Sequence, residues 1–306
     1  MELIFEKSRP GRAATSIPKC DVPEVEVDSI ISKNLLRDDV DLPEVAEVDL
    51  IRHYMQLSKR NFGVDVGFYP LGSCTMKYNP KVNEEVSRLS GFTALHPYAP
   101  IEFSQGSLQL MYELRQYLSE IFGMADFALQ PAAGAHGELT GVMVIKKYFE
   151  KKGEQRTYIL IPDAAHGTNP ASGALCGYGV VTVRSNAEGG VDIAHLRELM
   201  TENVAGLMLT NPNTLGLFER NIEQVADVIH AKGGFLYCDG ANANAFMGIT
   251  KPGDLGFDVI QLNLHKTFST PHGCGGPGSG PVGVRKNLVS HLPIPRVIKK
   301  ANRYGW

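Results

Sequence analysis

The chain has little of the features that would assign it to several special classes of protein. No run of roughly 18 apolar residues occurs, which argues against a transmembrane helix. Residues 1–7 lack a basic stretch followed by an apolar one, so no signal peptide is predicted. The net charge of -3, from 30 basic and 33 acidic residues, gives no reason to expect a nucleic-acid partner. We therefore expect neither a membrane nor a nucleic acid among its partners.

Cysteine is scarce, and its spacing is uninformative. The five cysteines, at positions 20, 74, 176, 238 and 274, include no Cys-x-x-Cys pair. An odd number without such a pair predicts free thiols in a reducing compartment. Together with the missing signal peptide, this favours a cytoplasmic protein. The nine histidines show no zinc-binding spacing, so no metal site is expected.

Phosphate-binding fingerprints are also missing. No Walker A pattern occurs. Residues 278–283 match Gly-x-Gly-x-x-Gly, but a dinucleotide fingerprint must follow a strand and open a helix. Here Pro281 interrupts the pattern, and Val282-Gly283-Val284 is itself predicted to be a strand. We reject a dinucleotide site at this position.

What the chain does contain is a regular alternation of helices and apolar strands. With 306 residues, 43% of them hydrophobic, it can form one large domain or two small ones. We predict an N-terminal arm and first helix over 1–60, and a large domain over 61–306. Strands are predicted at 158–161, 180–183, 206–209, 235–238 and 259–262. Helices are predicted at 49–60, 192–202 and 221–232. Two more helices are predicted, one that begins at residue 104 and one that is opened by the turn at 130–137. This order predicts an α/β fold, a mostly parallel sheet with helices on both faces.

Two side chains that follow predicted strands point to one cofactor. Lys266 comes just after the strand at 259–262 and before a glycine-rich turn, and a lysine there can form a Schiff base with an aldehyde. Asp239 ends the strand at 235–238, where a carboxylate can pair with a pyridinium nitrogen. Pyridoxal phosphate needs both groups. The alternative for Lys266 is a solvated lysine on the surface, and the alternative for Asp239 is an aspartate in a helix cap or a turn.

A phosphate site is predicted where Gly134 and Ala135 open a helix. Small residues let a ligand approach the backbone, and a helix N-terminus supplies free N–H donors. Glu138, which we expect in the first turn of this helix, suits the helix dipole, but it would repel a phosphate if it pointed inward. The alternative is a simple tight turn.

Three further residues lie close to predicted strand ends. His166 can stack on a cofactor ring, and Ala241 can pack against one ring face. Thr210 can offer a hydrogen bond to a ring hydroxyl. A loop histidine and a plain turn are the alternatives for His166 and Thr210.

Several motifs together resemble one family. Asn-Leu-His-Lys-Thr-Phe at 263–268, followed by Pro-His-Gly-Cys-Gly-Gly-Pro-Gly at 271–278, resembles glycine dehydrogenase (decarboxylating), the P-protein of the glycine cleavage system. The segments 69–80, 130–138 and 163–172 look like the same family. The resemblance covers essentially the whole chain and is strongest to subunit 2 of the two-subunit form.

This resemblance implies a fold-type I, pyridoxal-phosphate-dependent, transferase-like architecture. It makes Lys266 the Schiff-base lysine, Asp239 the pyridinium partner and His166 the stacking ring, the three catalytic residues. It also implies further cofactor contacts, with Ala133, Gly134 and Ala135 at the phosphate and His265 and Thr210 nearby.

The implied reaction is decarboxylation of glycine, with transfer of the aminomethyl group to the lipoyl group of H-protein. The implied partners are glycine, subunit 1 in a heterotetramer, and lipoylated H-protein. Family members continue into a smaller C-terminal domain, whereas this chain ends at Trp306, 40 residues after Lys266. We therefore expect a large domain without the small one. The open alternatives are another fold-type I decarboxylase or lyase, and a non-catalytic scaffold that binds the cofactor.

Overall fold

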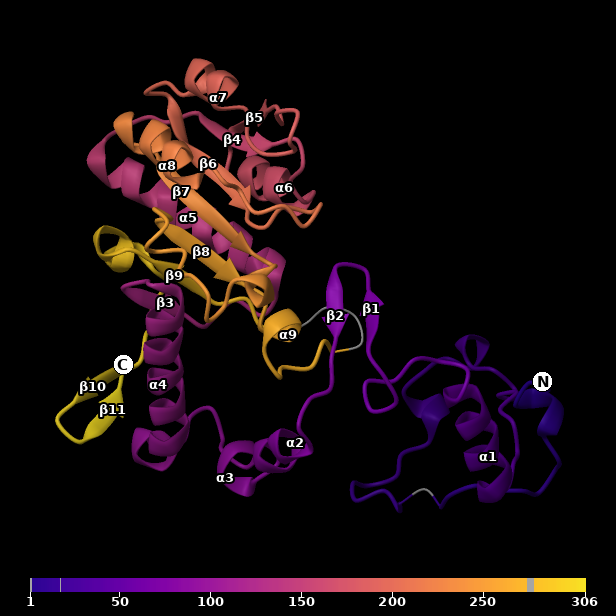
Figure 1. Cartoon of the computed structure of the whole chain (residues 1–306). Coiled ribbons are helices and arrows are strands. Elements are labelled where there is room, and N and C mark those ends of the chain that lie inside the picture. Colours follow the sequence, from indigo (N-terminus) through magenta and orange to yellow (C-terminus); the bar gives the residue numbers. More distant parts are fainter. Residues whose placement is uncertain (1, 17, 274–277) are drawn as a thin grey trace. The chain divides into compact units, whose positions relative to one another are not determined.

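The computed structural model describes residues 2–16, 18–273 and 278–306, in two compact units. They comprise Met1–Tyr69 and Pro70–Trp306, so the division falls later than the predicted boundary at residue 60. Figure 1 shows both units, and each is described by itself below.

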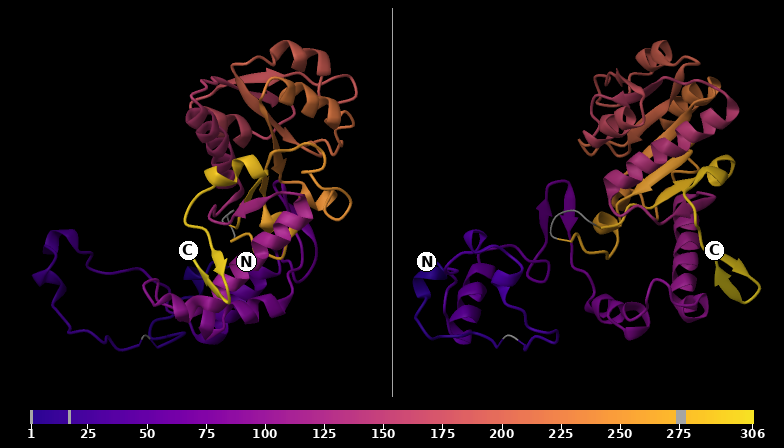
Figure 2. Two further views of the ribbon diagram at one scale, coloured as in Figure 1. Left: turned by 90° about the vertical axis from the view of Figure 1, so that its left-hand side faces the viewer. Right: turned by 180° about the vertical axis from the view of Figure 1, so that it is seen from behind.

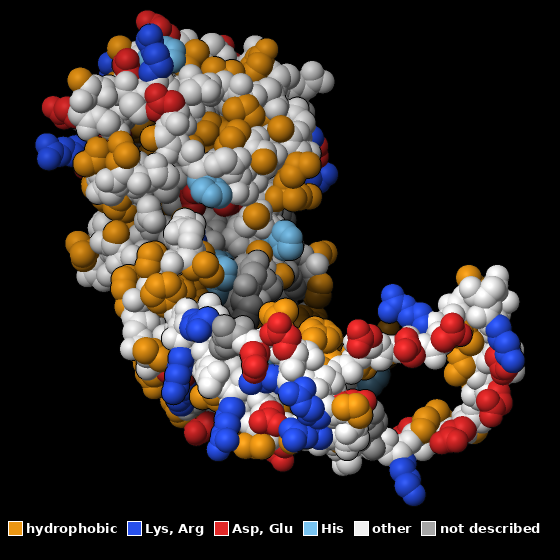
Figure 3. Space-filling model, turned by 90° about the vertical axis from the view of Figure 1, so that its right-hand side faces the viewer, with side chains coloured by type: hydrophobic (Ala, Val, Ile, Leu, Met, Phe, Trp, Pro, Cys, Tyr) orange, Lys and Arg blue, Asp and Glu red, His pale blue; other side chains and the backbone are white. Residues whose placement is uncertain are grey.

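The first unit is mostly extended chain around one helix. It contains short 3-10 turns, η1 (Phe5–Lys7), η2 (Val27–Ser29) and η3 (Lys33–Leu35), and the helix α1 (Glu47–Ser58). The helix predicted at 49–60 is therefore confirmed. The Arg9 N–H donates to the Glu44 carbonyl at 2.8 Å, which ties the start of the chain to the residues before α1. Between residues 21 and 44 the chain has eight acidic and two basic residues, and acidic side chains line this extended loop (Figure 3).

A seven-stranded sheet organises the second unit (Figures 1 and 2). Its strands lie in the order β3-β9-β8-β7-β6-β4-β5, and β9 runs antiparallel to both of its neighbours. The pairs β8-β7, β7-β6, β6-β4 and β4-β5 are parallel. The strands are β3 (Asp126–Ala128), β4 (Tyr158–Pro162), β5 (Gly179–Val183), β6 (Val204–Thr210), β7 (Phe235–Gly240), β8 (Val259–Leu262) and β9 (Val282–Val284). The predicted, mostly parallel sheet is confirmed.

The central strands form where the sequence has continuous apolar runs. Every residue of β6, β7 and β8 is buried. Parallel strands covered on both faces need such runs, because neither face meets water. The three-residue β3 is too short to show a period, and it was not predicted.

Helices cover both faces of the sheet, as predicted. The helices are α4 (Gln105–Phe122), α5 (Gly134–Lys152), α6 (Thr168–Leu175), α7 (Ile193–Leu199) and α8 (Ile222–Ala231). Residues of α4, α7 and α8 share one hydrophobic cluster, and residues of α5 share a second. Strand β7 divides between them, since Leu236 and Cys238 join the first cluster and Phe235 and Tyr237 join the second. This alternation puts the next residue of the second set, Asp239, on the α5 side of the sheet.

Shorter elements complete the unit. They are β1 (Tyr69–Leu71), β2 (Cys74–Met76), α2 (Lys81–Ser87), α3 (Ser90–Thr93), η4 (Ile101–Ser104), η5 (Ala243–Ala245), α9 (Leu264–Thr267), η6 (Lys286–His291), β10 (Ile298–Lys300) and β11 (Arg303–Gly305). Strand β1 pairs with β2, and β10 pairs with β11. Within the described ranges of the chain, none of the helices is both long enough and apolar enough to cross a membrane.

Candidate functional site

The carboxyl ends of three parallel strands bring the main predicted residues together. Thr210 at the end of β6 is in register with Asp239 near the end of β7. Asp239 is in turn in register with Gln261 of β8. The chain leaves β8 through Asn263 into the four-residue helix α9, which carries Lys266. Ligands of open α/β sheets bind at this edge, beyond the carboxyl ends of the strands.

Asp239 is held as an acceptor with two donors already in place. Its side chain is only 1% exposed. The Thr210 hydroxyl donates to Oδ2 at 3.0 Å, and the Ala241 N–H donates to Oδ1 at 3.0 Å. Each oxygen keeps a lone pair for a further donor. The carboxylate can therefore accept a proton-bearing ring nitrogen.

Lys266 is half-buried beside a turn of the segment 69–80, which the sequence linked to the family without assigning its residues a role. Its N–H donates to the Asn263 carbonyl at 2.9 Å, which fixes the backbone of α9. Its Nζ lies 3.2 Å from the hydroxyl of Ser73, in the turn between β1 and β2. Ser73 is thus a candidate site residue, although it lies 193 positions from the lysine.

The same turn is tied to the α9 region at two further points. The Lys77 ammonium donates to the carbonyls of His265, at 2.8 Å, and Thr270, at 3.2 Å. Burial lowers the pKa of Lys77, and the nearby Cys74 opposes that shift. The Cys74 Sγ lies 3.2 Å from Nε2 of His272. These contacts make residues 73–77 part of the wall around Lys266.

His265 is buried within this cluster and lies close to two other potential metal ligands. Its pKa is lowered to about 4, chiefly by burial and also by His272 and Lys266, so the ring is neutral at pH 7. Ligand atoms of Cys74, His265 and His272 lie within 4.8 Å of one another. The His265 ring nitrogens already face the Ser279 N–H and the Asn263 amide, both at 3.4 Å. We interpret the cluster as a hydrogen-bonded network that holds the segment around Lys266.

The start of α5 offers backbone donors at the same edge. Ala133 is its N-cap residue, and no side chain caps the helix there. The loop before β9 packs on this point, because the Gly280 N–H donates to the Pro131 carbonyl at 3.0 Å. A Cβ on Gly280 would lie 2.0 Å from the Ala133 oxygen, so only glycine permits this approach. Gly134 and Ala135, the predicted phosphate contacts, open the helix. Residues 274–277 of the predicted glycine-rich turn lie outside the described residues.

Glu138 is a site residue whose position the sequence left undecided. Because α5 begins at Gly134, Glu138 lies in its second turn and not in the first. It is 5% exposed, and its Oε2 has no hydrogen-bond partner among the described residues. The pKa of Glu138 is raised to about 8, chiefly by burial and also by the charge of Asp239, while Lys266 opposes both effects. The side chain therefore points inward as the neutral acid at pH 7, which removes the repulsion foreseen for an inward-pointing carboxylate.

His166 follows β4 and is exposed, and its Nδ1 accepts a hydrogen bond from the Thr168 N–H at 3.2 Å.

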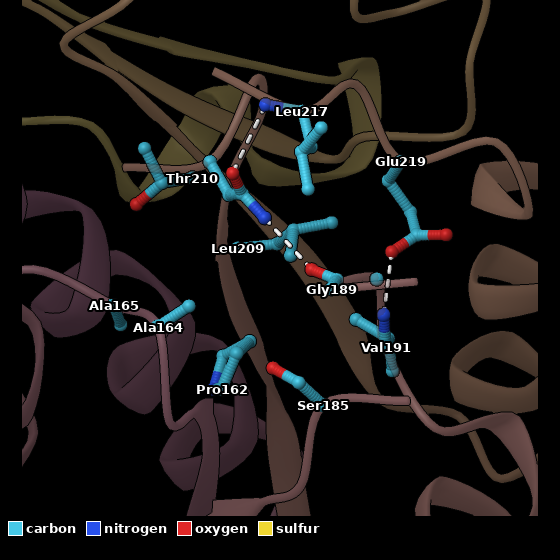
Figure 4. Close-up of a pocket in the computed structure, with 12 residues that line it drawn as sticks. Pro162, Ala164, Ala165, Ser185, Gly189, Val191, Leu209, Thr210, Leu217 and Glu219 are labelled. Carbon is cyan, nitrogen blue, oxygen red and sulfur yellow. Dashed lines mark hydrogen bonds between the residues drawn. The ribbon is translucent and has the colours of Figure 1, made fainter. Parts of the chain in front are cut away.

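A small cavity lies near His166, beside Thr210 (Figure 4). Its wall is held by hydrogen bonds from Asn213 to the Gly189 carbonyl and from the Val191 N–H to Glu219. The cavity measures about 20 Å³, room for about one water molecule, so it is not a cofactor pocket.

The fold and the residues at its strand ends define an α/β protein with a ligand site at the carboxyl edge of a mostly parallel sheet. A family model described as glycine cleavage system P-protein matches residues 24–301. The chain belongs to that family, which confirms the resemblance seen in the sequence.

Curated relatives agree with the family model. The chain is 62% identical over 305 residues to a probable glycine dehydrogenase (decarboxylating) subunit 2 from Alkaliphilus oremlandii, covering 99% of this chain and 63% of the relative. A protein of the same name from Caldanaerobacter subterraneus subsp. tengcongensis is 60% identical, with the same coverage. The chain thus spans about 63% of the length of these relatives.

Solved structures confirm the predicted fold class. A crystal structure of glycine decarboxylase (P-protein) of the glycine cleavage system, in inhibitor-bound form, superposes with a TM-score of 0.72 at 22% identity. It covers 91% of this chain and 62% of that one. A sphingosine-1-phosphate lyase from Burkholderia pseudomallei gives a TM-score of 0.60 at 15% identity, over 90% of this chain and 66% of that one. The architecture is that of the fold-type I enzymes.

Proposed function

We propose that this chain is the cofactor-carrying part of a glycine dehydrogenase (decarboxylating) and that its cofactor is pyridoxal phosphate. Its membership of the P-protein family and the printed names of its relatives support the proposal. The observation that carries it is that Lys266, in α9 just after β8, and the doubly hydrogen-bonded Asp239, near the end of β7, follow the carboxyl ends of two adjacent parallel strands.

The residues at this edge fit the aldehyde, the ring nitrogen and the phosphate of pyridoxal phosphate. Lys266 offers an amine for the aldehyde, and Asp239 is a buried carboxylate with lone pairs left for a pyridinium N–H. The uncapped first turn at Ala133, Gly134 and Ala135 offers N–H donors to a phosphate. The neutral acid at Glu138 adds no negative charge next to that phosphate at pH 7.

Pyridoxal phosphate, when bound, supplies an electron sink for the electron pair left on glycine as carbon dioxide departs. In this proposal Asp239 holds the proton of the ring nitrogen, with Thr210 keeping the carboxylate in place. The Lys266 amine binds the aldehyde, and Ser73 fixes the direction of its Nζ. His166 would stack on the cofactor ring, and Ala241 would pack against one ring face. His265 stays neutral and supports the backbone at Lys266.

We propose glycine as the substrate and the lipoyl disulfide of H-protein as the acceptor. A carbon–sulfur bond forms with the electron pair that the carboxylate leaves behind, the sulfur–sulfur bond breaks, and the second sulfur departs as a thiolate that takes up a proton. Subunit 1 is the proposed partner, in a heterotetramer, and the cytoplasm is the proposed location. The large-domain assignment of residues 61–306 belongs to the same proposal.

The first test is the visible absorbance of the chain with added pyridoxal phosphate. We expect a Schiff-base band in the wild type and in Lys251→Ala, since Lys251 pairs with Glu120 on the surface, at 2.7 Å. We expect no band in Lys266→Ala. A band that survives in Lys266→Ala would refute the assignment of the lysine.

The second test concerns the substrate. With subunit 1 and lipoylated H-protein present, glycine-dependent exchange of carbon dioxide is expected, and Lys266→Ala should abolish it. A panel of other amino acids, each with and without H-protein, separates this activity from that of another decarboxylase or lyase. Turnover of a different amino acid without H-protein would replace the proposal by that alternative.

A further inference from the structure

Helix α5 lies directly over the part of β7 that carries Asp239. Tyr237 and Asp239 are two positions apart in β7, so their side chains point to the same face of the sheet. A Cβ on Gly141 of α5 would lie 2.4 Å from Cε2 of Tyr237. Likewise, a Cβ on Gly137 would lie 2.7 Å from Cγ of Gln261, the residue in register with Asp239. The helix therefore descends over the sheet with Gly137 at the level of Asp239.

Glu138 follows Gly137 and is one turn from Gly141, so it shares the face of α5 that meets the sheet. Its side chain is 95% buried, and its Oε2 lacks a hydrogen-bond partner within the described part of the chain. The hydroxyl of the fully buried Tyr237 also lacks one. An unpartnered carboxyl oxygen and a phenol thus lie on the side of the sheet that Asp239 faces, and Glu138 is near enough for the charge of Asp239 to raise its pKa.

The two carboxyl groups have very different surroundings. Asp239 accepts hydrogen bonds from Thr210 and from the Ala241 N–H, whereas no such donor is placed at Glu138 Oε2. Two carboxylates that share a buried site do not both ionise, because each charge disfavours the other. The burial of Glu138 and the missing donor at its Oε2 favour the protonated form of this side chain.

We propose that Glu138 and Asp239 form a carboxyl pair that carries one proton at neutral pH, that the proton is on Glu138, and that Glu138 is a positioning residue for the cofactor through this pair. This role rests on the proposed function. With the proton on Glu138, Asp239 is the single negative charge beside the ring nitrogen, and Glu138 supplies a hydrogen-bond donor in place of a second charge.

The charged groups that reach Glu138 from the packed elements are few. Among the described residues, Asp239 of β7 raises its pKa and Lys266 of α9 lowers it. Burial keeps the Tyr237 phenol neutral, because it raises the pKa of Tyr237 well above its ordinary value. The state of the pair therefore depends on Asp239 and Lys266.

The direct test does not need the cofactor. Infrared difference spectra of the chain between neutral and alkaline pH should show the carbonyl stretch of one protonated carboxylic acid that is lost as the pH rises. The band should be missing in Glu138→Gln and retained in Asp239→Asn. Glu150→Gln, which changes an exposed glutamate of the same helix, should keep it. A band that is retained in Glu138→Gln but lost in Asp239→Asn would put the proton on Asp239 and overturn the proposal.

A second measurement tests the role at the cofactor. We expect equal affinities for pyridoxal phosphate in the wild type and Glu138→Gln at pH 6, where Glu138 is neutral. At pH 9 the wild type should bind about tenfold more weakly than the variant, the effect of one pKa unit, because ionised Glu138 repels an anionic cofactor. If the ratio of the wild-type affinity to the Glu138→Gln affinity stayed constant with pH, this role would be overturned. Failure of both proteins to bind would refute the proposed function and would leave the infrared result standing.

Discussion

A change of Glu138 to glutamine should stabilise the folded chain, increasingly so as the pH rises. Glutamine keeps the shape of the side chain but cannot ionise. The wild-type acid has a pKa of about 8 in the folded chain, chiefly because of burial, and an ordinary value of 4.5 once exposed by unfolding. Between these two values the folded chain holds a proton that the unfolded chain releases. The wild type therefore loses stability relative to the variant as the pH rises through this window.

The size of this effect follows from the two pKa values. At 1.36 kcal/mol for each pKa unit, the interval from 4.5 to about 8 corresponds to about 5 kcal/mol above pH 8 and to about 3 kcal/mol at pH 7. These figures are upper limits, because water entry and side-chain movement relieve part of the burial of the charge. Even half of this amount is a large share of the roughly 5–15 kcal/mol that keeps a domain folded.

Urea unfolding of both proteins from pH 5 to pH 9 measures this difference. The gain in unfolding free energy for Glu138→Gln should be below about 1 kcal/mol at pH 5, should grow with pH, and should level off above pH 8. Glu150→Gln on the same helix is the matched control. It loses only an exposed ion pair with Lys147, worth less than about 1 kcal/mol, and should show no such growth. A constant difference between wild type and Glu138→Gln would refute the burial of a protonated acid.

Two further substitutions test the packing that supports the site. Gly141→Ala brings a methyl group to 2.4 Å from a buried tyrosine ring and should lower the free energy of unfolding by about 1–3 kcal/mol, whereas Gly106→Ala, whose Cβ meets nothing within 4 Å, should not lower it. Asp126→Ala leaves the buried Arg115 guanidinium without its carboxylate and should lower the free energy of unfolding by about 3–5 kcal/mol. Its control, Glu120→Ala, breaks an exposed ion pair and should lower the free energy of unfolding by less than about 1 kcal/mol. Urea unfolding measures the free energy of unfolding of each variant and its control. An equal loss in a variant and its control would contradict the structure.

The fold could be predicted wherever burial leaves a pattern in the sequence. Strands such as β6 and β8 are buried on both faces, so they are mostly apolar and stand out between polar loops. Strand β3 has only three residues and pairs with β9, far along the chain, so its local sequence holds no such signal. The antiparallel direction of β9 likewise depends on tertiary contacts.

The candidate site was predictable in its strand-end residues and not in its surroundings. Lys266 and Asp239 follow apolar strands, and that position made them visible in the sequence. Ser73 and Cys74 come from a turn more than 190 residues away, and only the folded chain brings them to Lys266 and His272. No local pattern encodes such a contact.

Glu138 shows a different limit. Its place near the start of a helix was evident, but its direction was not, because a glutamate there is equally compatible with solvent and with the core. The three glycines around it, at 134, 137 and 141, bring α5 close to the sheet, since a Cβ on each would lie within 2.7 Å of another residue. That glycine spacing is the signal that could have identified the buried face.

The most direct test of the central claim is to trap the cofactor on the chain and locate it. The chain is mixed with pyridoxal phosphate, with and without subunit 1, reduced with borohydride, digested, and analysed by mass spectrometry. We predict a single major label, on the peptide that contains Lys266, and its loss in Lys266→Ala. A label on other lysines with Lys266 unmodified, in folded protein with subunit 1 present, would contradict the account.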